Sequence, residues 1–187
     1  MMIQKKKQPR KISPDYLRNS GLFYLQRYTA SSHHFRTIMQ RKINRSIAVH
    51  TSLDKEECFK WLEDVINEFL EYGYLNDEAY LRAMLQSLRT SKGLSTKMII
   101  MKLRQKGFKE PEIKEALALL PSENDDSREA EWQAAIIFAK RKKLGPYHPD
   151  PPRKTQEQQL AAFARAGFPY EVGKKLVFDA NELEINE

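Results

Sequence analysis

A pattern that occurs three times along the chain limits its fold more than any other sequence feature. Each copy begins with a hydroxyl residue suited to cap a helix, has an apolar residue eight positions later, and reaches a predicted helix end after twelve. The copies are Ser31 with Met39 and Ile43, Ser95 with Leu103 and Gly107, and Thr155 with Phe163 and Gly167, at spacings of 64 and 60 residues. Such recurrence is typical of a repeat protein.

Helical patterns flank each copy. The preceding helices are predicted over residues 14–28, 77–92 and 127–143, and the following ones over residues 54–72, about 111–120 and about 170–178. A three-helix unit of this size buries little apolar surface alone, so neighbouring units are expected to stack. The sequence therefore predicts an all-α fold, in which tandem three-helix repeats form an elongated, curved rod with essentially no strand.

Local signals set the boundaries of these elements. Ser13, Asp54 and Asn76 are suited to cap helices at their N-termini. Glycine readily adopts the left-handed conformation that ends a helix, and Gly73 and Gly93 are interpreted in this way. We expect a disordered basic arm over residues 1–12, three-helix units over 13–72, 73–120 and 128–178, a linker over 121–127 and an acidic tail over 179–187. On the first helix, Leu17, Gly21, Tyr24, Leu25 and Tyr28 share one predicted inward face.

The formal charge of +7 is unevenly distributed. Residues 1–50 contain eleven Lys and Arg residues and one acid, and residues 82–109 contain eight and none. Residues 54–78 instead contain nine acids and two bases. Segregation of this kind predicts a basic face that meets an anionic partner, either nucleic acid or an acidic protein surface. A face that is merely solvated is the alternative interpretation.

Several classes of protein are disfavoured by what the sequence contains. The single cysteine, Cys58, lies on an apolar helix stripe and indicates a core residue in a reducing cytoplasm. The longest apolar stretches are far too short to cross a bilayer, and no secretory signal is apparent. His33 and His34 are adjacent and make a poor metal site. Trp61 and Trp132 are interpreted as packing residues. With no glycine-rich phosphate loop and no catalytic constellation, we expect no enzyme, cofactor, metal site or membrane contact.

The central part of the chain resembles the RecX family. The resemblance depends on residues 73–80 (Gly-Tyr-Leu-Asn-Asp-Glu-Ala-Tyr), 92–95 (Lys-Gly-Leu-Ser) and 103–108 (Leu-Arg-Gln-Lys-Gly-Phe). Residues 24–28 and 35–39 are similar to the first unit of that family, and residues 142–145 with 167–168 to its last, so the resemblance spans about residues 14–178. One departure is Ile43-Asn44, which replaces a glycine at the second turn of the first unit.

The resemblance implies both a fold and a function. RecX proteins consist of tandem three-helix units, and they regulate the RecA recombinase. This chain is therefore expected to bind RecA filaments on single-stranded DNA, to inhibit strand exchange and the coupled ATP hydrolysis, and so to modulate recombination and DNA repair. The partner implied is the RecA filament, direct contact with single-stranded DNA is left open, and the protein itself is expected to be a monomer.

The candidate partner-binding residues are the cations of the central unit, and we expect them to contact RecA or DNA phosphate. They are Arg82, Arg89, Lys92, Lys102, Arg104 and Lys106. Arg82 and Arg89 are seven residues apart and are expected to flank the inward stripe of Leu81, Leu85 and Leu88 while staying in solvent. Lys102 and Lys106 are four apart and share a face.

The main alternative is a non-specific or helix-turn-helix-like DNA-binding module. Base readout would fall to the helix after Gly107, but residues 111–117 carry acids that oppose it. Sequence-specific DNA binding is therefore disfavoured, whereas non-specific contact with phosphates stays open.

Overall fold

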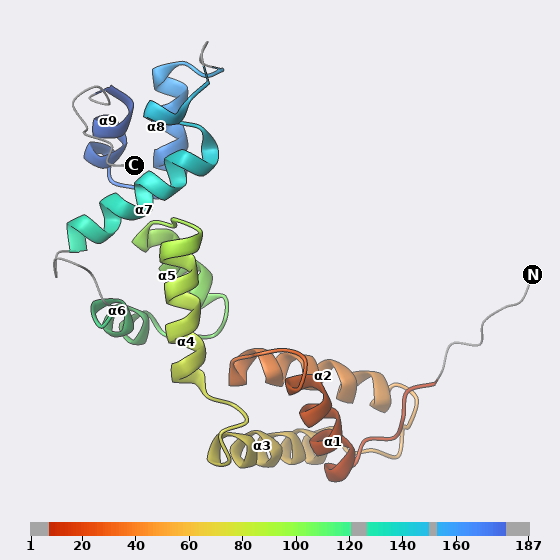
Figure 1. Ribbon diagram of the computed structural model, residues 1–187. Coiled ribbons are helices and arrows are strands. Elements are labelled where there is room, and N and C mark those ends of the chain that lie inside the picture. Colours follow the sequence, from red (N-terminus) through yellow and green to blue (C-terminus); the bar gives the residue numbers. More distant parts are fainter. Residues whose placement is uncertain (1–7, 121–126, 150–152, 179–187) are drawn as a thin grey trace, which may run out of the picture. The chain divides into compact units, whose positions relative to one another are not determined.

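The computed structural model describes residues 8–120, 127–149 and 153–178, and within these ranges the chain is helical with no strand (Figure 1). The prediction of an all-α fold is confirmed. The chain divides into two compact units, unit 1 over Met1–Tyr80 and unit 2 over Leu81–Glu187. Within the predicted arm, linker and tail, residues 1–7, 121–126 and 179–187 lie outside the described ranges.

The helices follow the predicted order along the chain. Unit 1 contains α1 (Pro14–Leu25), α2 (Ser32–Ile47), α3 (Lys55–Glu71) and the first turn of α4 (Asp77–Gln86). Unit 2 contains the rest of α4, the π-helical turn η1 (Ser87–Ser91), α5 (Thr96–Arg104), α6 (Glu110–Ala118), α7 (Ser127–Lys142), the 3₁₀ turn η2 (Gly145–Tyr147), α8 (Gln156–Arg165) and α9 (Tyr170–Phe178).

The predicted capping residues all cap helices. Each accepts a hydrogen bond from a backbone N–H of the first turn: Ser13 from Tyr16, Ser31 from His34, Asp54 from Glu56, Asn76 from Ala79, Ser95 from Met98 and Thr155 from Gln158. The predicted terminating glycines, Gly73, Gly93, Gly107 and Gly167, all have positive φ. The template found in the sequence is therefore confirmed at its starts and at two of its three ends.

The core of unit 1 lies between α1, α2 and α3. Its fully buried side chains include Leu17, Phe35, Met39, Ile43, Leu62, Ile66 and Phe69. Gly21 lets α1 approach α2 and α3 closely, because a Cβ there would lie 2.8 Å from atoms of both the Phe35 and the Phe69 rings. Cys58 is buried in the same cluster, and that burial raises the pKa of its thiol. The expectation that it is a core residue is confirmed.

Two helix ends in unit 1 differ from the prediction. Ile43 was expected to end the second helix, but α2 continues to Ile47. The buried face of α2 extends past Ile43 to Ser46, and no glycine interrupts the helix. On α1, the helix ends at Leu25, and Tyr28 is 59% exposed instead of facing inward.

The N-terminal segment is packed where a disordered arm was expected. Ile12 is buried, its N–H donates to Ser46 Oγ at 3.2 Å, and that hydroxyl donates to the Arg10 carbonyl at 2.8 Å. The His50 ring lies 3.0 Å from the Pro9 carbonyl oxygen. The expectation that residues 1–12 pack against nothing is wrong for residues 9–12.

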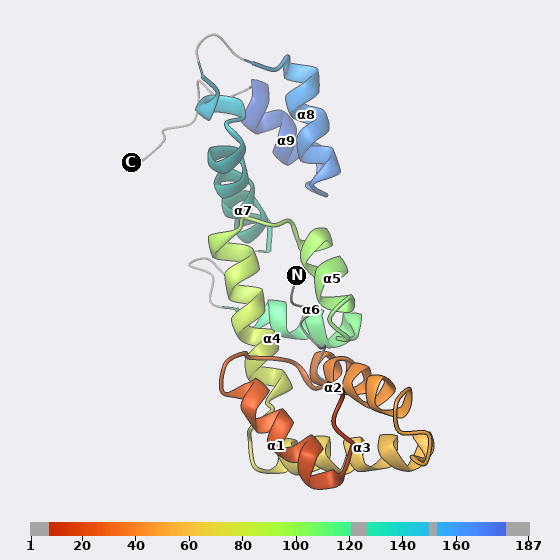
Figure 2. The ribbon, with the colours of Figure 1, turned by 90° about the vertical axis from the view of Figure 1, so that its right-hand side faces the viewer.

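Unit 2 contains two helical groups. In the first, α5 packs against α6, with Ile99, Leu103 and Ile113 buried. In the second, α7, α8 and α9 lie together (Figure 2). The buried apolar side chains of this group are Ala134, Ala135, Ala139, Leu144, Phe163, Phe168, Leu176 and Val177. Trp132 is partly buried against this cluster, and Trp61 against the core of unit 1, which agrees with their interpretation as packing residues.

The two groups of unit 2 meet where η1 contacts α7. Gly93, which follows η1 with φ +57°, allows this approach, because a Cβ there would lie 2.7 Å from the Ala134 carbonyl oxygen. Residues 77–92 were expected to form one regular helix. Instead Lys92 N–H donates to the Ser87 carbonyl five residues back, at 3.1 Å, and the last turn widens into a π-helix.

Candidate partner-binding surface

The structure places the six predicted cations on three consecutive elements of unit 2. Arg82 is exposed on α4, Lys92 follows η1 and is exposed, and Lys102 and Arg104 are exposed on α5. Lys106 is half-buried in the turn after α5. The carbonyl of Lys92 accepts a hydrogen bond from Arg141 of α7, so this cation stands beside the meeting point of η1 and α7.

Arg89 lies in a different environment from the other five. Its guanidinium donates to Glu131 Oε2 at 2.8 Å and to Thr96 Oγ1 at 2.7 Å. The side chains of Arg89 and Glu131 are each only 12% exposed. The expectation that Arg89 stays in solvent is wrong, because a carboxylate of α7 faces it across the contact between η1 and α7, which we call the junction of unit 2. Arg89 is thereby placed to position η1, α5 and α7 relative to one another.

A carboxylate also lies beside Arg104. Glu110 Oε2 is 3.7 Å from Arg104, and Glu110 Oε1 accepts from Lys114 at 2.8 Å. The hydrogen bond from Lys114 lowers the pKa of Glu110. Arg104 is 65% exposed and Glu110 41%, so water screens their attraction and the guanidinium stays available to a partner.

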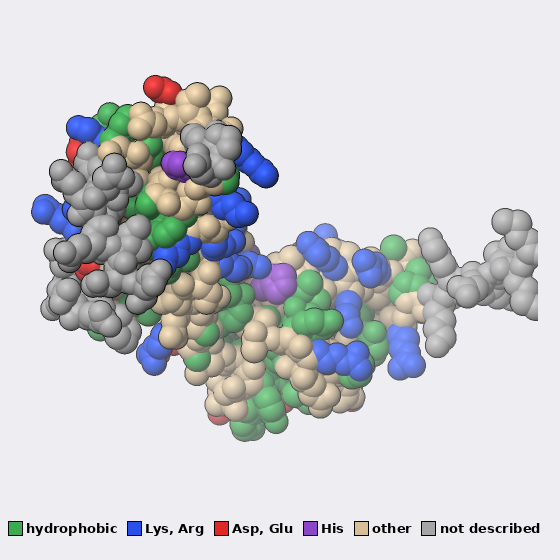
Figure 3. Space-filling model, turned by 45° about the horizontal axis from the view of Figure 1, so that its top comes forward, with side chains coloured by type: hydrophobic (Ala, Val, Ile, Leu, Met, Phe, Trp, Pro, Cys, Tyr) green, Lys and Arg blue, Asp and Glu red, His purple; other side chains and the backbone are tan. Residues whose placement is uncertain are grey.

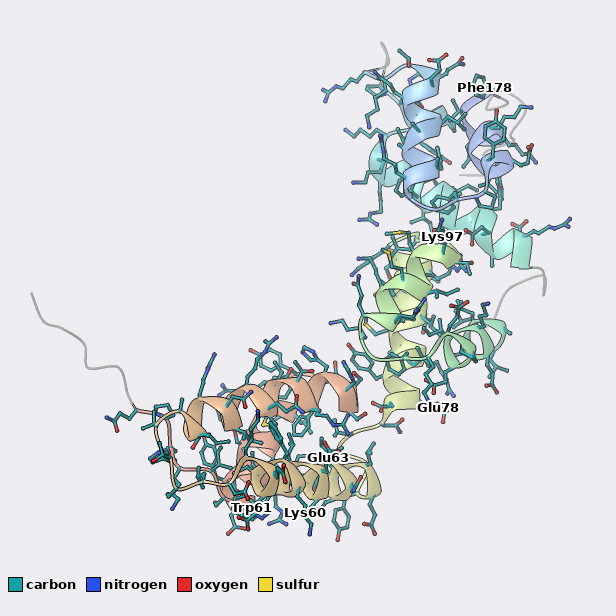
Figure 4. All side chains as sticks on the ribbon, turned by 180° about the vertical axis from the view of Figure 1, so that it is seen from behind. Lys60, Trp61, Glu63, Glu78, Lys97 and Phe178 are labelled. Atoms are coloured by element: carbon teal, nitrogen blue, oxygen red, sulfur yellow. The ribbon has the colours of Figure 1, made fainter. Side chains whose placement is uncertain are left out.

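The geometry of α5 divides its cations between two faces. Lys102 and Arg104 stand on opposite sides of the buried Leu103, because consecutive helical residues are about 100° apart. Arg104 instead shares a face with exposed Lys97, seven residues earlier and labelled in Figure 4. Lys97 was not among the predicted residues, although its spacing from Arg104 would have identified it. No acid occurs in α5.

A second basic surface lies on unit 1. Helix α2 contains four Lys and Arg residues and no acid, and Figure 3 shows Lys and Arg side chains gathered over this face, on the right of the picture. Of the acids on neighbouring α3, Glu63 accepts both Arg36 hydrogen bonds at 2.7 Å, and Glu68 accepts Arg18 at 2.8–3.0 Å. The sequence showed the charge excess here, but no residue of α2 was among the predicted partner-binding residues.

The described ranges contain neither a metal-binding cluster nor a membrane-spanning helix. Within them, no three His, Cys, Asp or Glu side chains lie close enough together to hold a metal ion. No described helix combines the length and apolar character needed to cross a membrane. The titratable side chains of these ranges serve mainly as ion-pair and capping partners, as with Glu63, Glu68 and Glu131.

Fold and surface together define the class: an all-helical repeat protein with cationic faces. Residues 76–117 match the family model described as "RecX, second three-helix domain". The chain is 38% identical over 178 residues to the regulatory protein RecX of Myxococcus xanthus, covering 94% of this chain and 90% of that protein. It is 30% identical over 168 residues to the regulatory protein RecX of Agrobacterium fabrum, covering 87% and 82%. The chain belongs to the RecX family of regulatory proteins.

A solved structure supports the fold independently. The crystal structure of RecX from Lactobacillus salivarius superposes with a TM-score of 0.63, over 91% of this chain and 97% of that one. The two sequences are only 14% identical, so this likeness concerns the fold alone.

Proposed function

We propose that this protein binds RecA recombinase filaments on single-stranded DNA, inhibits their strand exchange and ATP hydrolysis, and thereby modulates recombination and DNA repair. The observation that carries the proposal is the 38% identity to the Myxococcus regulatory protein over nearly the full length of both chains. The protein acts by occupying a filament surface, and it performs no chemistry itself.

We assign the partner-binding surface to five of the six predicted cations of unit 2. Arg82 lies on α4, Lys92 follows η1, Lys102 and Arg104 lie on two faces of α5, and half-buried Lys106 lies in the turn after α5, all inside the segment that matches the family model. Cations on such a face are suited to acidic protein surface or to phosphate, since charge complementarity sets orientation and accelerates association. Arg89 belongs to the junction of the same unit and acts as a positioning residue.

A DNA-binding module that ignores RecA is the competing function. Helix α6, which would follow the turn in a helix-turn-helix arrangement, carries Glu110, Glu112 and Glu115. Carboxylates on that helix would repel the phosphates flanking a major groove, so the described surface favours the regulatory function over base readout.

The first test measures RecA ATPase activity on single-stranded DNA as this protein is added. We expect the hydrolysis rate to fall as the protein approaches and exceeds the concentration of RecA protomers. An unchanged rate at a few-fold excess over RecA would contradict the proposal. Binding of naked DNA with no effect on RecA would favour the DNA-binding module instead.

Charge reversal then tests the surface itself. Lys92, Lys102 and Arg104 are replaced together by Glu, and the matched control replaces exposed Lys142, Lys154 and Lys174 by Glu, so that both variants change the charge by the same amount. We expect the first variant to need at least tenfold more protein for half-inhibition, and the control to inhibit as the original protein does. Equal losses in both variants would show that only net charge matters.

A further inference from the structure

A hollow on unit 1 lies apart from the surface proposed on unit 2. It has a volume of about 800 Å³, and its lining includes Pro9, Arg10, Tyr16, Lys42 and Arg45. Three elements therefore contribute to it: the N-terminal segment, α1 and α2. All three charged side chains in its lining are cations.

The wall formed by the N-terminal segment is fixed in place. Ser46 of α2 bridges the two ends of that segment, accepting from Ile12 N–H and donating to the Arg10 carbonyl, while His50 lies against the Pro9 carbonyl. Ile12 is 2% exposed, which anchors the backbone next to the hollow. A wall ordered before a ligand arrives lowers the entropic cost of binding it.

The formal charge of the hollow's lining is positive. No acid occurs in the sequence between Asp15 and Asp54, and α2 has none. Lys42 Nζ donates to Ser20 Oγ at 2.5 Å, which holds the ammonium in position and leaves two of its three protons for a ligand. Three cations, with no carboxylate in the lining of the hollow, form a site for phosphate oxygens.

We propose that this hollow binds the backbone of single-stranded DNA. Arg10, Lys42 and Arg45 contact successive phosphates, and the half-buried ring of Tyr16 provides a surface on which a base stacks. An unpaired strand can present a phosphate and a base face to one recess, whereas a duplex keeps its base faces stacked inside. The inference rests on the proposed function, because unit 1 then binds the DNA of the filament and unit 2 binds RecA.

The test uses naked, fluorescently labelled single-stranded DNA without RecA, and anisotropy reports binding. Arg10 and Arg45, both exposed, are replaced together by Glu. The control replaces Lys55 and Lys60 of α3, also exposed, by Glu; Lys60 is labelled in Figure 4. We expect affinity to fall at least tenfold in the first variant and less than twofold in the control. Equal losses in both would overturn the proposal. Melting temperatures measured by circular dichroism establish that both variants are folded.

The salt dependence of the affinity for single-stranded DNA gives the number of phosphates that the protein neutralises. With three cations engaged, the slope of log affinity against log salt concentration is about −2, at roughly 0.7 per phosphate of a single strand. The Arg10→Glu/Arg45→Glu variant should show a slope near −0.7. An unchanged slope would mean that the phosphates are neutralised elsewhere on the protein.

The stacking surface is tested separately. Tyr16→Phe keeps the ring and should bind as the original protein does, whereas Tyr16→Leu keeps the apolar packing and should lose about tenfold in affinity. An unlabelled duplex of the same length should compete poorly, and a duplex that competes equally well would overturn the single-strand assignment. Absence of DNA binding beside intact inhibition of RecA ATPase removes this inference alone, and the reverse result removes the proposed function alone.

Discussion

Arginine–glutamate ion pairs join helices in both units, but the two pairs of unit 1 and the Arg89–Glu131 pair of unit 2 lie in opposite environments. In unit 1, Arg18–Glu68 and Arg36–Glu63 lie at the surface of an apolar core, with side chains between 28% and 45% exposed. In unit 2, the Arg89–Glu131 pair is only 12% exposed on each side and lies between η1 and α7. The same chemistry therefore joins neighbouring helices in one unit and two helical groups in the other.

The buried pair is stabilised by a set of further hydrogen bonds. Glu131 also accepts from Thr96 N–H at 3.1–3.2 Å and from Thr96 Oγ1 at 2.6 Å. Across the described residues, every buried side-chain nitrogen and oxygen has a partner. Removing two charges from water is costly, and only a fully satisfied geometry offsets that cost. The junction of unit 2 thus requires one specific arrangement, whereas the apolar core of unit 1 tolerates small shifts of its surface pairs.

The largest predicted effect comes from breaking the buried pair. Glu131→Ala leaves the Arg89 charge buried without compensation and removes the acceptor of Thr96, so we expect the unfolding free energy of unit 2 to fall by about 3–5 kcal/mol. Glu63→Ala in unit 1 is the matched change at an exposed pair, and it should cost at most about 1 kcal/mol. Urea denaturation measures the loss of unfolding free energy in each variant, and hydrogen exchange of the α3 and α7 amides shows which unit has lost stability. Similar losses in the two variants would show that the buried pair contributes no more than the exposed pair.

Capping serines give a second, smaller contrast. Ser13 caps α1, whereas Ser95 caps α5 and also donates to the Ala166 carbonyl at 2.6 Å, 71 residues away. Ser13→Ala should cost about 1 kcal/mol for the lost cap. Ser95→Ala should cost about 2 kcal/mol, because it removes the cap and the long-range hydrogen bond. Thermal melts monitored by circular dichroism measure both. If Ser95→Ala costs no more than Ser13→Ala, the bond to Ala166 adds nothing.

What the sequence predicted correctly depends on interactions between near neighbours. A cap such as Ser31 bonds an N–H three residues away, and a glycine such as Gly73 ends a helix through its own φ, so both are visible in a short window of sequence. The triple repeat combined several such local signals, and this is why the helix order and most helix starts were confirmed.

What the sequence missed depends on distant partners. Arg89 has the spacing of an exposed residue on the helix predicted over residues 77–92, and only the fold brings Glu131, 42 residues later, against it. Residues 9–12 carry no helical stripe, and their docking depends on Ser46, 34 residues from Ile12. The hollow lined by Arg10 and Arg45 exists only because of that docking, so its residues could not be selected from charge counts.

The smallest predicted effect is the pH dependence that the exposed pairs of unit 1 contribute. The hydrogen bonds from Arg36 and from Arg18 lower the pKa of Glu63 and the pKa of Glu68, respectively. A carboxyl whose folded pKa lies below its unfolded value contributes stability above the unfolded value, about 4.5, and loses it as the pH falls through the folded value. Hydrogen exchange in α2 and α3 should therefore accelerate, relative to its intrinsic rate, below about pH 4.5.

The double variant Glu63→Gln/Glu68→Gln isolates that contribution, since glutamine keeps the side-chain shape and does not titrate in this range. It should be slightly less stable than the original protein at pH 7 and should lose less stability on acidification. The unfolding free energies of the two proteins should therefore converge as the carboxyls protonate. Water screens both pairs, so the difference at pH 7 should be smaller than either effect above. Parallel curves for the two proteins down to pH 3 would show that these surface pairs contribute nothing to unit 1, and that its apolar core alone holds the three helices together.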